Sequence, residues 1–324
     1  MRAVRVIAGE TGGQVRVEEV DAPTIAPGKV LVAVKASGVN RGEILAMRAK
    51  RSGEGVGAGI EFAGVVEAVG EGVSDWRSGD RVMGHGPGGH AETILTSPGS
   101  LMRCPERLTW TEAAAFPNVF ITAHDALVTN AEFAAGESVL VNAASSGIGV
   151  AAIQIASALG ASVVIGVSRG AGKLAALEKF GMTDGINSFV VDLADTVKLA
   201  TAGRGVDIII DSVGGSVLGD NMRALAVQGR LVGVGRLGGP NAEIDLDLLA
   251  LNRLKLIGVT FRTRSEAERL ACIAACARDL LPLLAAGRIS PCVDRVFPMS
   301  GVADAYAYME TNSHIGKIVL ETAA

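Results

Sequence analysis

The chain has 324 residues, and its 30 Lys and Arg against 34 Asp and Glu give a formal net charge of −4. This length suits two domains with separate cores, and the acidic balance gives no reason to expect nucleic acid or an anionic membrane as a partner. Hydrophobic residues make up 49% and aromatic residues only 4%, a composition that favours α/β layers with close helix–sheet packing.

The N-terminus and the cysteines both indicate a cytoplasmic protein. Met1–Gln14 contains Arg2, Arg5 and Glu10 and lacks the apolar run of a signal peptide. The 4 cysteines form no Cys-x-x-Cys pair and suggest no disulfide framework, which fits a reducing compartment.

From Met1 to about Ile121 the pattern predicts short strands and turns. Runs of β-branched residues alternate with glycine and proline about every ten residues, as in a partly closed antiparallel barrel. We interpret Met47–Gly59, which is rich in Gly, Arg and Lys, as a surface loop or lid. The expected strands are Val15–Val20, Lys29–Ala36, Gly64–Val69 and Arg81–Met83.

From about Thr122 to Phe261 strands alternate with helices, which predicts a doubly wound parallel sheet. The expected strands are Val139–Asn142, Val163–Val167, Gly185–Ile186, Val206–Asp211, Arg230–Val234 and Leu256–Thr260. The expected helices are Ile148–Leu159, Gly172–Phe180, Asp192–Ala202, Val217–Val227 and Asp245–Asn252. Ligands of such sheets bind outside the carboxyl ends of the strands.

The remaining chain is expected to rejoin the first domain. It contains one long predicted helix, then a strand, a helix and a strand: Ser265–Leu284, Val293–Phe297, Val302–Thr311 and Lys317–Glu321. The predicted domains are therefore 1–121 plus 262–324, which is β-rich, and 122–261, an inserted nucleotide-binding unit, with a ligand cleft where they meet.

A glycine turn at the start of the second domain predicts a dinucleotide site. The β-branched run Val139–Val141 leads into Ala143-Ala144-Ser145-Ser146-Gly147-Ile148-Gly149, and an Ala-rich helical segment follows. Such a turn places a pyrophosphate on the N–H groups of a helix N-terminus. Two alternatives are a membrane span over the uncharged stretch Val139–Ser168 and glycines that only pack helix against strand.

The residues after the second strand favour NADPH over NADH. NAD-binding sheets carry an acidic residue there that accepts from the ribose 2′-OH. This chain has Ser168 and Arg169 instead, with Lys173 one turn into the next helix and no carboxylate between Glu137 and Glu178. A hydroxyl and two cations suit a 2′-phosphate, although a solvated basic loop is the alternative.

Several motifs spread over nearly the whole chain carry a family resemblance. They are Val39-Asn40-Arg41-Gly42-Glu43, Gly59-Ile60-Glu61-Phe62-Ala63-Gly64, Gly79-Asp80-Arg81-Val82, Gly89-His90-Ala91-Glu92, Glu112-Ala113-Ala114-Ala115-Phe116-Pro117, Thr122-Ala123, Asp211-Ser212-Val213-Gly214-Gly215 and Gly316-Lys317-Ile318-Val319-Leu320. In these the chain resembles the zinc-independent quinone oxidoreductases of the medium-chain dehydrogenase/reductase (MDR) superfamily. The resemblance implies a GroES-like catalytic domain, a Rossmann domain, NADPH, homodimers, and reduction of quinones or activated C=C bonds.

The resemblance also implies site residues. Asn40 would lie near the nicotinamide and substrate, and Asn118 and Thr122 would flank the nicotinamide end. Lys317 would reach the phosphates or ribose of the cofactor. The other implied cofactor contacts are Val213, Gly233, Val234, Gly235, Phe261 and Arg262. The plain alternatives are a loop-capping amide for Asn40 and a strand-edge charge for Lys317.

No zinc is expected. In zinc-dependent relatives a ligand cysteine aligns with Asn40 and a ligand histidine with Ile60, and neither residue here is an equivalent ligand. The turn also resembles that of short-chain dehydrogenases, but Tyr306 has Glu310 where those enzymes need lysine. Without a metal or a Tyr–Lys acid, a conjugated acceptor is easier to reduce than an isolated ketone.

Two other functions stay open at this point. One is reduction of enoyl thioesters, as in the related modules of polyketide synthases. The other is an NADPH-binding protein without catalytic activity. His85 is a candidate proton relay, although a lone histidine in a glycine-rich turn is more often a bystander.

Overall fold

The computed structural model describes residues 1–322 and divides into two compact units. The first unit holds residues 1–119 and the described chain from Leu270 onward, and the second holds Phe120–Arg269. The borders fall inside helices α3 (Pro117–His124) and α9 (Glu266–Ala285). Residues 262–269, which we assigned to the first domain, group with the second unit, where Arg264 pairs with Asp125 at 2.7 Å.

The second unit contains one six-stranded parallel sheet in the order β11-β10-β9-β12-β13-β14. This is the strand order of the Rossmann fold, so the doubly wound prediction is confirmed. The β-branched runs form its buried centre, and all five residues of β9 are buried. The bounds are β9 Ser138–Asn142, β10 Val163–Ser168, β11 Asp184–Asn187, β12 Val206–Asp211, β13 Leu225–Gly233 and β14 Lys255–Gly258.

Four helices of the second unit, α5 to α8, are shorter than predicted, and two of them differ in kind at one end. The predicted helix Val217–Val227 is wrong at its end, because α7 stops at Ala224 and β13 begins at Leu225. The predicted Gly172–Phe180 is a short α-helix followed by a 3-10 turn. The bounds are α4 Gly147–Ala158, α5 Ala171–Ala175, α6 Leu193–Ala200, α7 Leu218–Ala224 and α8 Leu246–Leu251, with a π-helix at Asp125–Asn130 and 3-10 turns at Glu178–Phe180 and Gly215–Val217.

The uncharged stretch Val139–Ser168 is a strand, a helix and a strand of this unit, and the membrane-span alternative is wrong. Parallel strands covered on both faces are as apolar as a membrane helix, which explains the ambiguity. No helix within residues 1–322 combines the length and apolar character needed to cross a bilayer.

The first unit is β-rich, as expected of a GroES-like domain. Its large sheet has the order β15-β16-β3-β5-β6-β8, with β7 paired to β3, and a small sheet has the order β2-β1-β4. The strand pairs are antiparallel except β15–β16. The bounds are β1 Arg2–Ile7, β2 Gln14–Glu19, β3 Val30–Gly38, β4 Val56–Gly57, β5 Glu61–Val69, β6 Arg81–His85, β7 Thr93–Thr96, β8 Leu101–Arg103, β15 Val293–Pro298 and β16 Lys317–Glu321.

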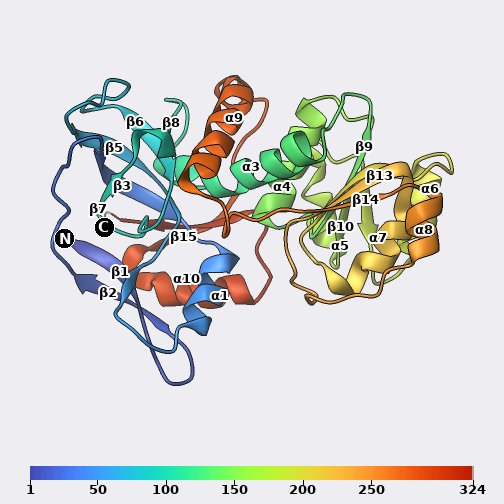
Figure 1. Ribbon diagram of the computed structural model, residues 1–324, viewed down its shortest axis with the longest axis horizontal. Helices are drawn as coiled ribbons and strands as arrows, with labels where there is room; N and C mark the ends of the chain where they lie inside the picture. The colour runs from blue at the N-terminus through green and yellow to red at the C-terminus, as the bar shows by residue number, and fades with distance from the viewer. Residues whose placement is uncertain (323–324) are drawn as a thin grey trace. The chain divides into compact units, whose positions relative to one another are not determined.

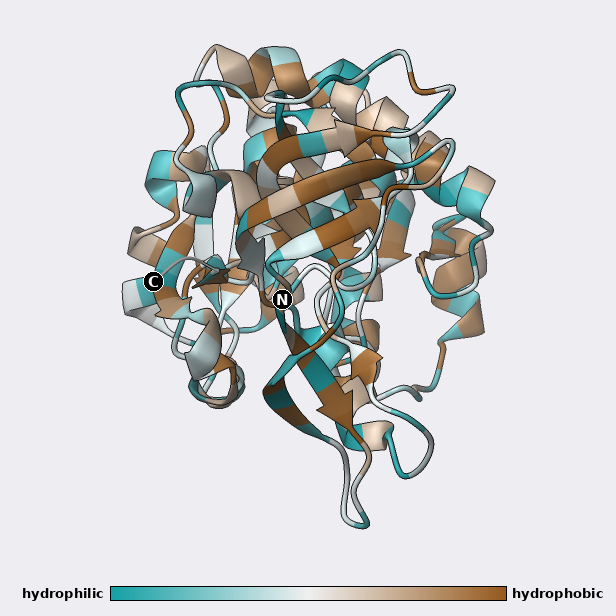
Figure 2. Cartoon of the chain, turned by 90° about the vertical axis from the view of Figure 1, so that its left-hand side faces the viewer, coloured by the Kyte–Doolittle hydropathy of each residue, from teal (hydrophilic) through white to brown (hydrophobic). Residues whose placement is uncertain are grey.

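The C-terminal segment packs into this unit. Strand β16 pairs with β3, and α10 (Val302–Glu310) shares a core with β1 and α1 (Arg41–Ala49) through Val4, Ile44 and Tyr306. Figure 1 shows red α10 beside blue α1 and β1, and Figure 2 shows the strands of this unit mostly in brown, hydrophobic colours. The other helical elements are α2 Trp110–Ala114 and 3-10 turns at Pro98–Ser100 and Met299–Gly301.

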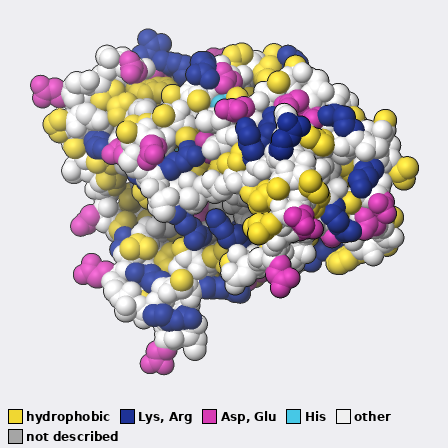
Figure 3. Space-filling model, turned by 45° about the vertical axis from the view of Figure 1, so that its right-hand side comes forward, with side chains coloured by type: hydrophobic (Ala, Val, Ile, Leu, Met, Phe, Trp, Pro, Cys, Tyr) yellow, Lys and Arg dark blue, Asp and Glu magenta, His cyan; other side chains and the backbone are white. Residues whose placement is uncertain are grey.

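The interpretation of Met47–Gly59 as one long loop is wrong. Helix α1 continues to Ala49, and Val56–Gly57 forms β4 on the edge of β1. Local sequence could not show this strand, because its pairing partner lies some fifty residues earlier in the chain. The surface drawn in Figure 3 mixes basic and acidic side chains, in keeping with the nearly balanced composition.

Candidate functional site

The glycine turn of the second unit forms the start of helix α4. After buried β9 the chain turns at Ala143, which has a positive φ of 51°. Ser146 is the N-cap of α4, and its Oγ accepts a hydrogen bond from Gly149 N at 3.0 Å. Ser145, Gly147 and Ile148 are only half-buried at this end. The remaining N–H groups of the first turn and the helix dipole favour an anion there.

Gly149 is needed where the turn meets the helix. A Cβ on Gly149 would lie 2.5 Å from Ala144 O and 2.6 Å from Ala143 O. Real side chains do not approach backbone oxygens so closely, so any larger residue would push α4 away from the turn. The packing explanation therefore holds for Gly149, and it also serves the anion site because it fixes the helix end.

The other predicted cofactor residues of this unit lie at the carboxyl ends of neighbouring strands. Ser168 ends β10 and exposed Arg169 follows it, with half-buried Lys173 on α5. Half-buried Val213 follows β12. Gly233 is the last residue of β13, and Val234 and Gly235 follow it. In a parallel sheet these ends share one edge, which is the usual place of a dinucleotide.

Asp211 holds two of these loops together. Its carboxylate accepts from Val213 N at 2.8 Å and Gly214 N at 2.9 Å, and its backbone oxygen accepts from Val234 N at 2.7 Å. Burial raises the pKa of Asp211, although the hydrogen bonds from these amides act to lower it. The loops after β12 and β13 are thus fixed against each other.

Three further predicted residues stand outside these loops. Thr122 is buried on α3, four residues after Asn118 on the same helix. Phe261 and exposed Arg262 follow β14, and Arg262 N donates to Thr260 Oγ1 at 3.2 Å. The Arg264 guanidinium lies 4.8 Å from the Phe261 ring centre. The predicted roles of Thr122 at the nicotinamide end and of Phe261 and Arg262 along the cofactor stay predictions.

Asn40 is the centre of a buried polar cluster in the first unit. The residue is 7% exposed and precedes α1, but its side chain does not cap that helix. Asn40 Nδ2 lies 2.9 Å from both Glu43 Oε1 and Glu61 Oε1 and 3.2 Å from Gly38 O. The amide hydrogens thus face two carboxylates as well as the backbone oxygen of Gly38, so capping of the local backbone is only part of what this side chain does.

Lys317 completes this cluster from β16. Its Nζ donates to Glu61 Oε1 at 2.6 Å, to Val39 O at 2.7 Å and to Asn40 Oδ1 at 2.8 Å. The ammonium thus uses its three donors inside the protein, and its side chain is 4% exposed. The structure thus places Lys317 in a buried cluster that the sequence did not predict, and its contact with the phosphates or ribose of the cofactor stays a prediction. It also excludes the strand-edge charge as its explanation.

Asn118 joins the same cluster. Its Nδ2 donates to Asn40 Oδ1 at 2.7 Å, and its backbone N donates to Glu61 Oε2 at 2.7 Å. Asn118 Oδ1 lies 3.2 Å from His85 Nε2. Asn40 Oδ1 therefore receives two donors, from Lys317 and Asn118, while Asn40 Nδ2 faces only acceptors. This pattern fixes the orientation of the Asn40 amide.

Sequence reasoning assigned no role to Glu43, Glu61, His90 or Tyr306, although motifs quoted for the resemblance contain the first three. Fully buried His90 lies between Ser37 Oγ at 2.8 Å and Glu43 Oε2 at 3.1 Å, and Tyr306 OH donates to Glu43 Oε2 at 3.2 Å. Burial acts to raise the pKa of Glu43, but His90, the hydrogen bond from Asn40 and the charge of Lys317 together hold that pKa below its usual range. Burial, with the Glu43 carboxylate, raises the pKa of Tyr306.

Two family models match the chain. Residues 26–121 match the alcohol dehydrogenase GroES-like domain, and residues 147–275 match the zinc-binding dehydrogenase model. The quinone oxidoreductase-like protein 2 of Bos taurus is 32% identical over 308 residues, which cover 94% of this chain and 88% of that protein.

Solved structures agree with these matches over the full length. A quinone oxidoreductase of Pseudomonas syringae pv. Tomato has a TM-score of 0.87 at 25% identity and covers 99% of this chain and 100% of its own. The CurK enoyl reductase has a TM-score of 0.84 at 26% identity and covers 99% of both chains.

The zinc in the name of one family model does not fit the Asn40 cluster. Catalytic zinc takes three Cys, His or carboxylate ligands and an open position. Here the ammonium of Lys317 already lies against Asn40 and Glu61. Within residues 1–322 no group of three or more His, Cys, Asp or Glu side chains is placed to bind a metal ion.

Proposed function

Since this chain belongs to the medium-chain dehydrogenase/reductase superfamily, we propose that it is an NADPH-dependent, metal-independent oxidoreductase that reduces quinones or α,β-unsaturated carbonyls. Membership implies a nicotinamide cofactor, whose reduced ring supplies a hydride when bound. The single observation that carries the proposal is that the N-terminus of α4 and Arg169 lie at the same edge of the parallel sheet, at the carboxyl ends of β9 and β10. The proposal includes a cytoplasmic homodimer, as the family resemblance implies.

The residues present fit the phosphates of NADPH. The N–H groups of Gly147 and Ile148 at the start of α4 suit a pyrophosphate, because they have no partner within the helix. Ser168, Arg169 and Lys173 provide a hydroxyl and two cations for a 2′-phosphate. A carboxylate in their place would favour the free 2′-OH of NADH instead.

The hydrogen bonds of the two tyrosines support a conjugated acceptor as the substrate, because both hydroxyl groups already donate to carboxylates. Tyr306 is 3% exposed and donates to Glu43, and Tyr308 OH donates to Asp294 Oδ2 at 2.8 Å. These are the 2 tyrosines of the chain, and both hydroxyl protons are engaged. Quinones and enones spread the negative charge that follows hydride addition, so they depend less on a strong acid. The contribution of the protein is then mainly proximity and orientation.

Reduction of an enoyl thioester is the second candidate. It is favoured by the likeness to the CurK enoyl reductase over nearly the full length of both chains. The chemistry is the same conjugate hydride addition, so the two candidates differ only in the acceptor. An acyl thioester therefore belongs among the acceptors that are tested.

The test is a stopped-flow assay of NADPH oxidation by the purified protein with 1,4-benzoquinones, enones, enoyl thioesters and ketones, and of NADP⁺ reduction by secondary alcohols. We expect turnover with the conjugated acceptors and the same rates after treatment with a zinc chelator. Turnover with alcohols and simple ketones alone, or its loss with the chelator, would contradict the proposal. Tight NADPH binding without turnover on any acceptor would indicate the non-catalytic alternative.

The Arg169→Asp variant tests the choice of cofactor. Loss of a charge-assisted hydrogen bond and the added repulsion should raise the KM for NADPH by about 10-fold to 100-fold. The KM for NADH should change much less, because NADH has no 2′-phosphate. Steady-state kinetics with both cofactors measure this difference, and equal effects on the two would reject the assignment of Arg169.

A further inference from the structure

We propose that Phe189 is a stacking platform for the adenine ring of the cofactor. This inference rests on the proposed function, because it assigns one more part of the same nucleotide. Phe189 is an aromatic side chain that the fold leaves exposed to solvent. Phe189 is 71% exposed, although large aromatic rings usually contribute to cores.

The loop that carries Phe189 is held in place by local hydrogen bonds. Phe189 N donates to Asn187 Oδ1 at 3.1 Å, and Val190 N donates to Asn187 O at 3.1 Å. Asn187 is the last residue of strand β11. The backbone that carries the ring is therefore already ordered, so binding a ligand on the ring loses little further conformational entropy.

Strand pairing places Phe189 at the same edge of the sheet as Arg169. Strands β10 and β11 are parallel neighbours, and Ser168 pairs with Asn187. Arg169 follows Ser168, and its guanidinium carbon lies 6.0 Å from the centre of the Phe189 ring. A cation at this distance from the ring is within the range of a cation–π contact. An aromatic face and a guanidinium thus lie together where the 2′-phosphate is expected.

The order of the strands indicates in which direction along the sheet edge the adenosine half of NADPH extends. The pyrophosphate is expected at α4, which follows β9, and the ribose phosphate at Ser168 and Arg169, which follow β10. The next strand beyond β10 is β11, about 4.8 Å further along the edge. The base lies beyond the ribose in the nucleotide, so this direction brings it to the loop with Phe189. Purines stack on aromatic side chains and on guanidinium planes.

A partner protein is the competing occupant, since exposed Val190 and Val191 follow Phe189. The position favours the purine, because Phe189 lies next to Arg169 at the ligand-binding edge of the sheet. The two occupants differ in one property that can be measured. A purine platform affects binding of the nucleotide, and a protein-docking patch does not.

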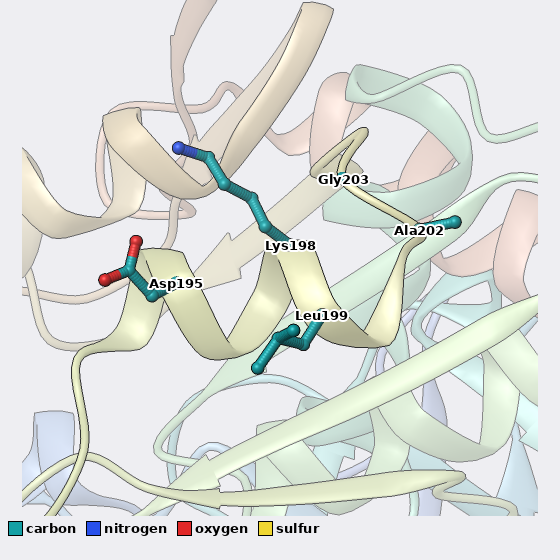
Figure 4. A pocket seen from close by; sticks show the side chains of 5 residues that line it. All are labelled: Asp195, Lys198, Leu199, Ala202 and Gly203. Atoms are coloured by element: carbon teal, nitrogen blue, oxygen red, sulfur yellow. The ribbon is translucent and has the colours of Figure 1, made fainter.

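The experiment compares Phe189→Ala with Leu199→Ala by calorimetry and steady-state kinetics. Leu199 is a matched control, since it is 84% exposed and belongs to α6, where it lines a shallow hollow together with Asp195, Lys198, Ala202 and Gly203 (Figure 4). Leu199 lies near the C-terminal end of α6, the helix that connects β11 to β12, and so away from the carboxyl edge of the sheet. Both exposed positions should tolerate alanine without loss of folding.

We expect Phe189→Ala to weaken binding of NADPH and of 2′,5′-ADP by about 10-fold, the usual range for a lost base stack. The kcat at saturating NADPH should stay unchanged, because the stack is the same in the ground and transition states. Phe189→Trp should keep the affinity of the wild type. Leu199→Ala should change neither quantity.

Three results would overturn the inference. The first is an unchanged affinity in Phe189→Ala, which would leave the loop as a protein-docking patch. The second is a full loss of the Phe189→Ala effect in an Arg169→Ala background, since Phe189 would then act only by holding Arg169. The third is a wild-type protein that binds neither NADPH nor 2′,5′-ADP, which would also contradict the proposed function. The first two results would leave the proposed function intact.

Discussion

Replacing Lys317 by methionine is expected to destabilise the protein by about 3–5 kcal/mol, the usual cost of removing one partner of a buried ion pair. The substitution leaves the Glu61 carboxylate, whose side chain is fully buried, without its cation. It also takes one of the two donors from Asn40 Oδ1. Urea unfolding followed by circular dichroism measures the change.

Two further variants separate the ion pair from general effects. Lys35→Met removes an exposed lysine from strand β3 of the same unit and should change the free energy of unfolding by less than about 0.5 kcal/mol. The double variant Lys317→Met with Glu61→Gln should recover part of the loss, because no buried charge then remains unpaired. A Lys317→Met variant as stable as Lys35→Met would contradict the buried pair.

The same cluster changes the role expected of Asn40. Its Oδ1 receives Lys317 and Asn118, and its Nδ2 faces Glu43 and Glu61. A substrate oxygen would have to displace one of these partners to bind the amide. The geometry therefore favours Asn40 as a positioning residue that orients Asn118 and, through it, His85. Contact of Asn40 with the substrate stays a prediction.

The parallel sheet could be predicted because its signals are local. Its central strands β9, β10 and β12 contain apolar, β-branched runs, and glycine, with the Ser146 cap, marks the turn into α4. The errors fall where local sequence fits two structures. Leu225-Ala226-Val227 continues the helical pattern of α7, but the chain needs these residues to begin β13. Pairing with β12 decides the outcome, and a single sequence does not show it.

The Asn40 cluster could not be assembled from the sequence for the same reason. Glu43 lies three residues from Asn40, but Glu61, His90 and Lys317 come from distant parts of the chain. Only strand pairing in the large sheet brings β16 and β5 to opposite sides of β3. An isolated lysine after a glycine suggests a surface cation when these neighbours are unknown.

A single methyl group on Gly149 is expected to weaken NADPH binding by about 100-fold. The Cβ of Gly149→Ala would lie 2.5 Å from Ala144 O and 2.6 Å from Ala143 O, so helix α4 or the turn must move. Its N-terminal amides would then lose their common direction, and two charge-assisted hydrogen bonds to a phosphate account for a loss of this size. Overpacking of this kind also costs about 1–3 kcal/mol of stability. Calorimetry with 2′,5′-ADP and NADPH, well below the melting temperature of the variant, measures the affinity.

Gly219→Ala provides the matched control for this change. Gly219 lies on helix α7 of the same unit, and a Cβ there would meet nothing within 4 Å. Alanine favours a helix over glycine by up to about 1 kcal/mol, so Gly219→Ala should be as stable as the wild type or more stable. It should also bind NADPH with unchanged affinity. If both variants bound NADPH equally well, the α4 N-terminus would not hold the pyrophosphate, because only at Gly149 does an added Cβ meet the backbone of the turn.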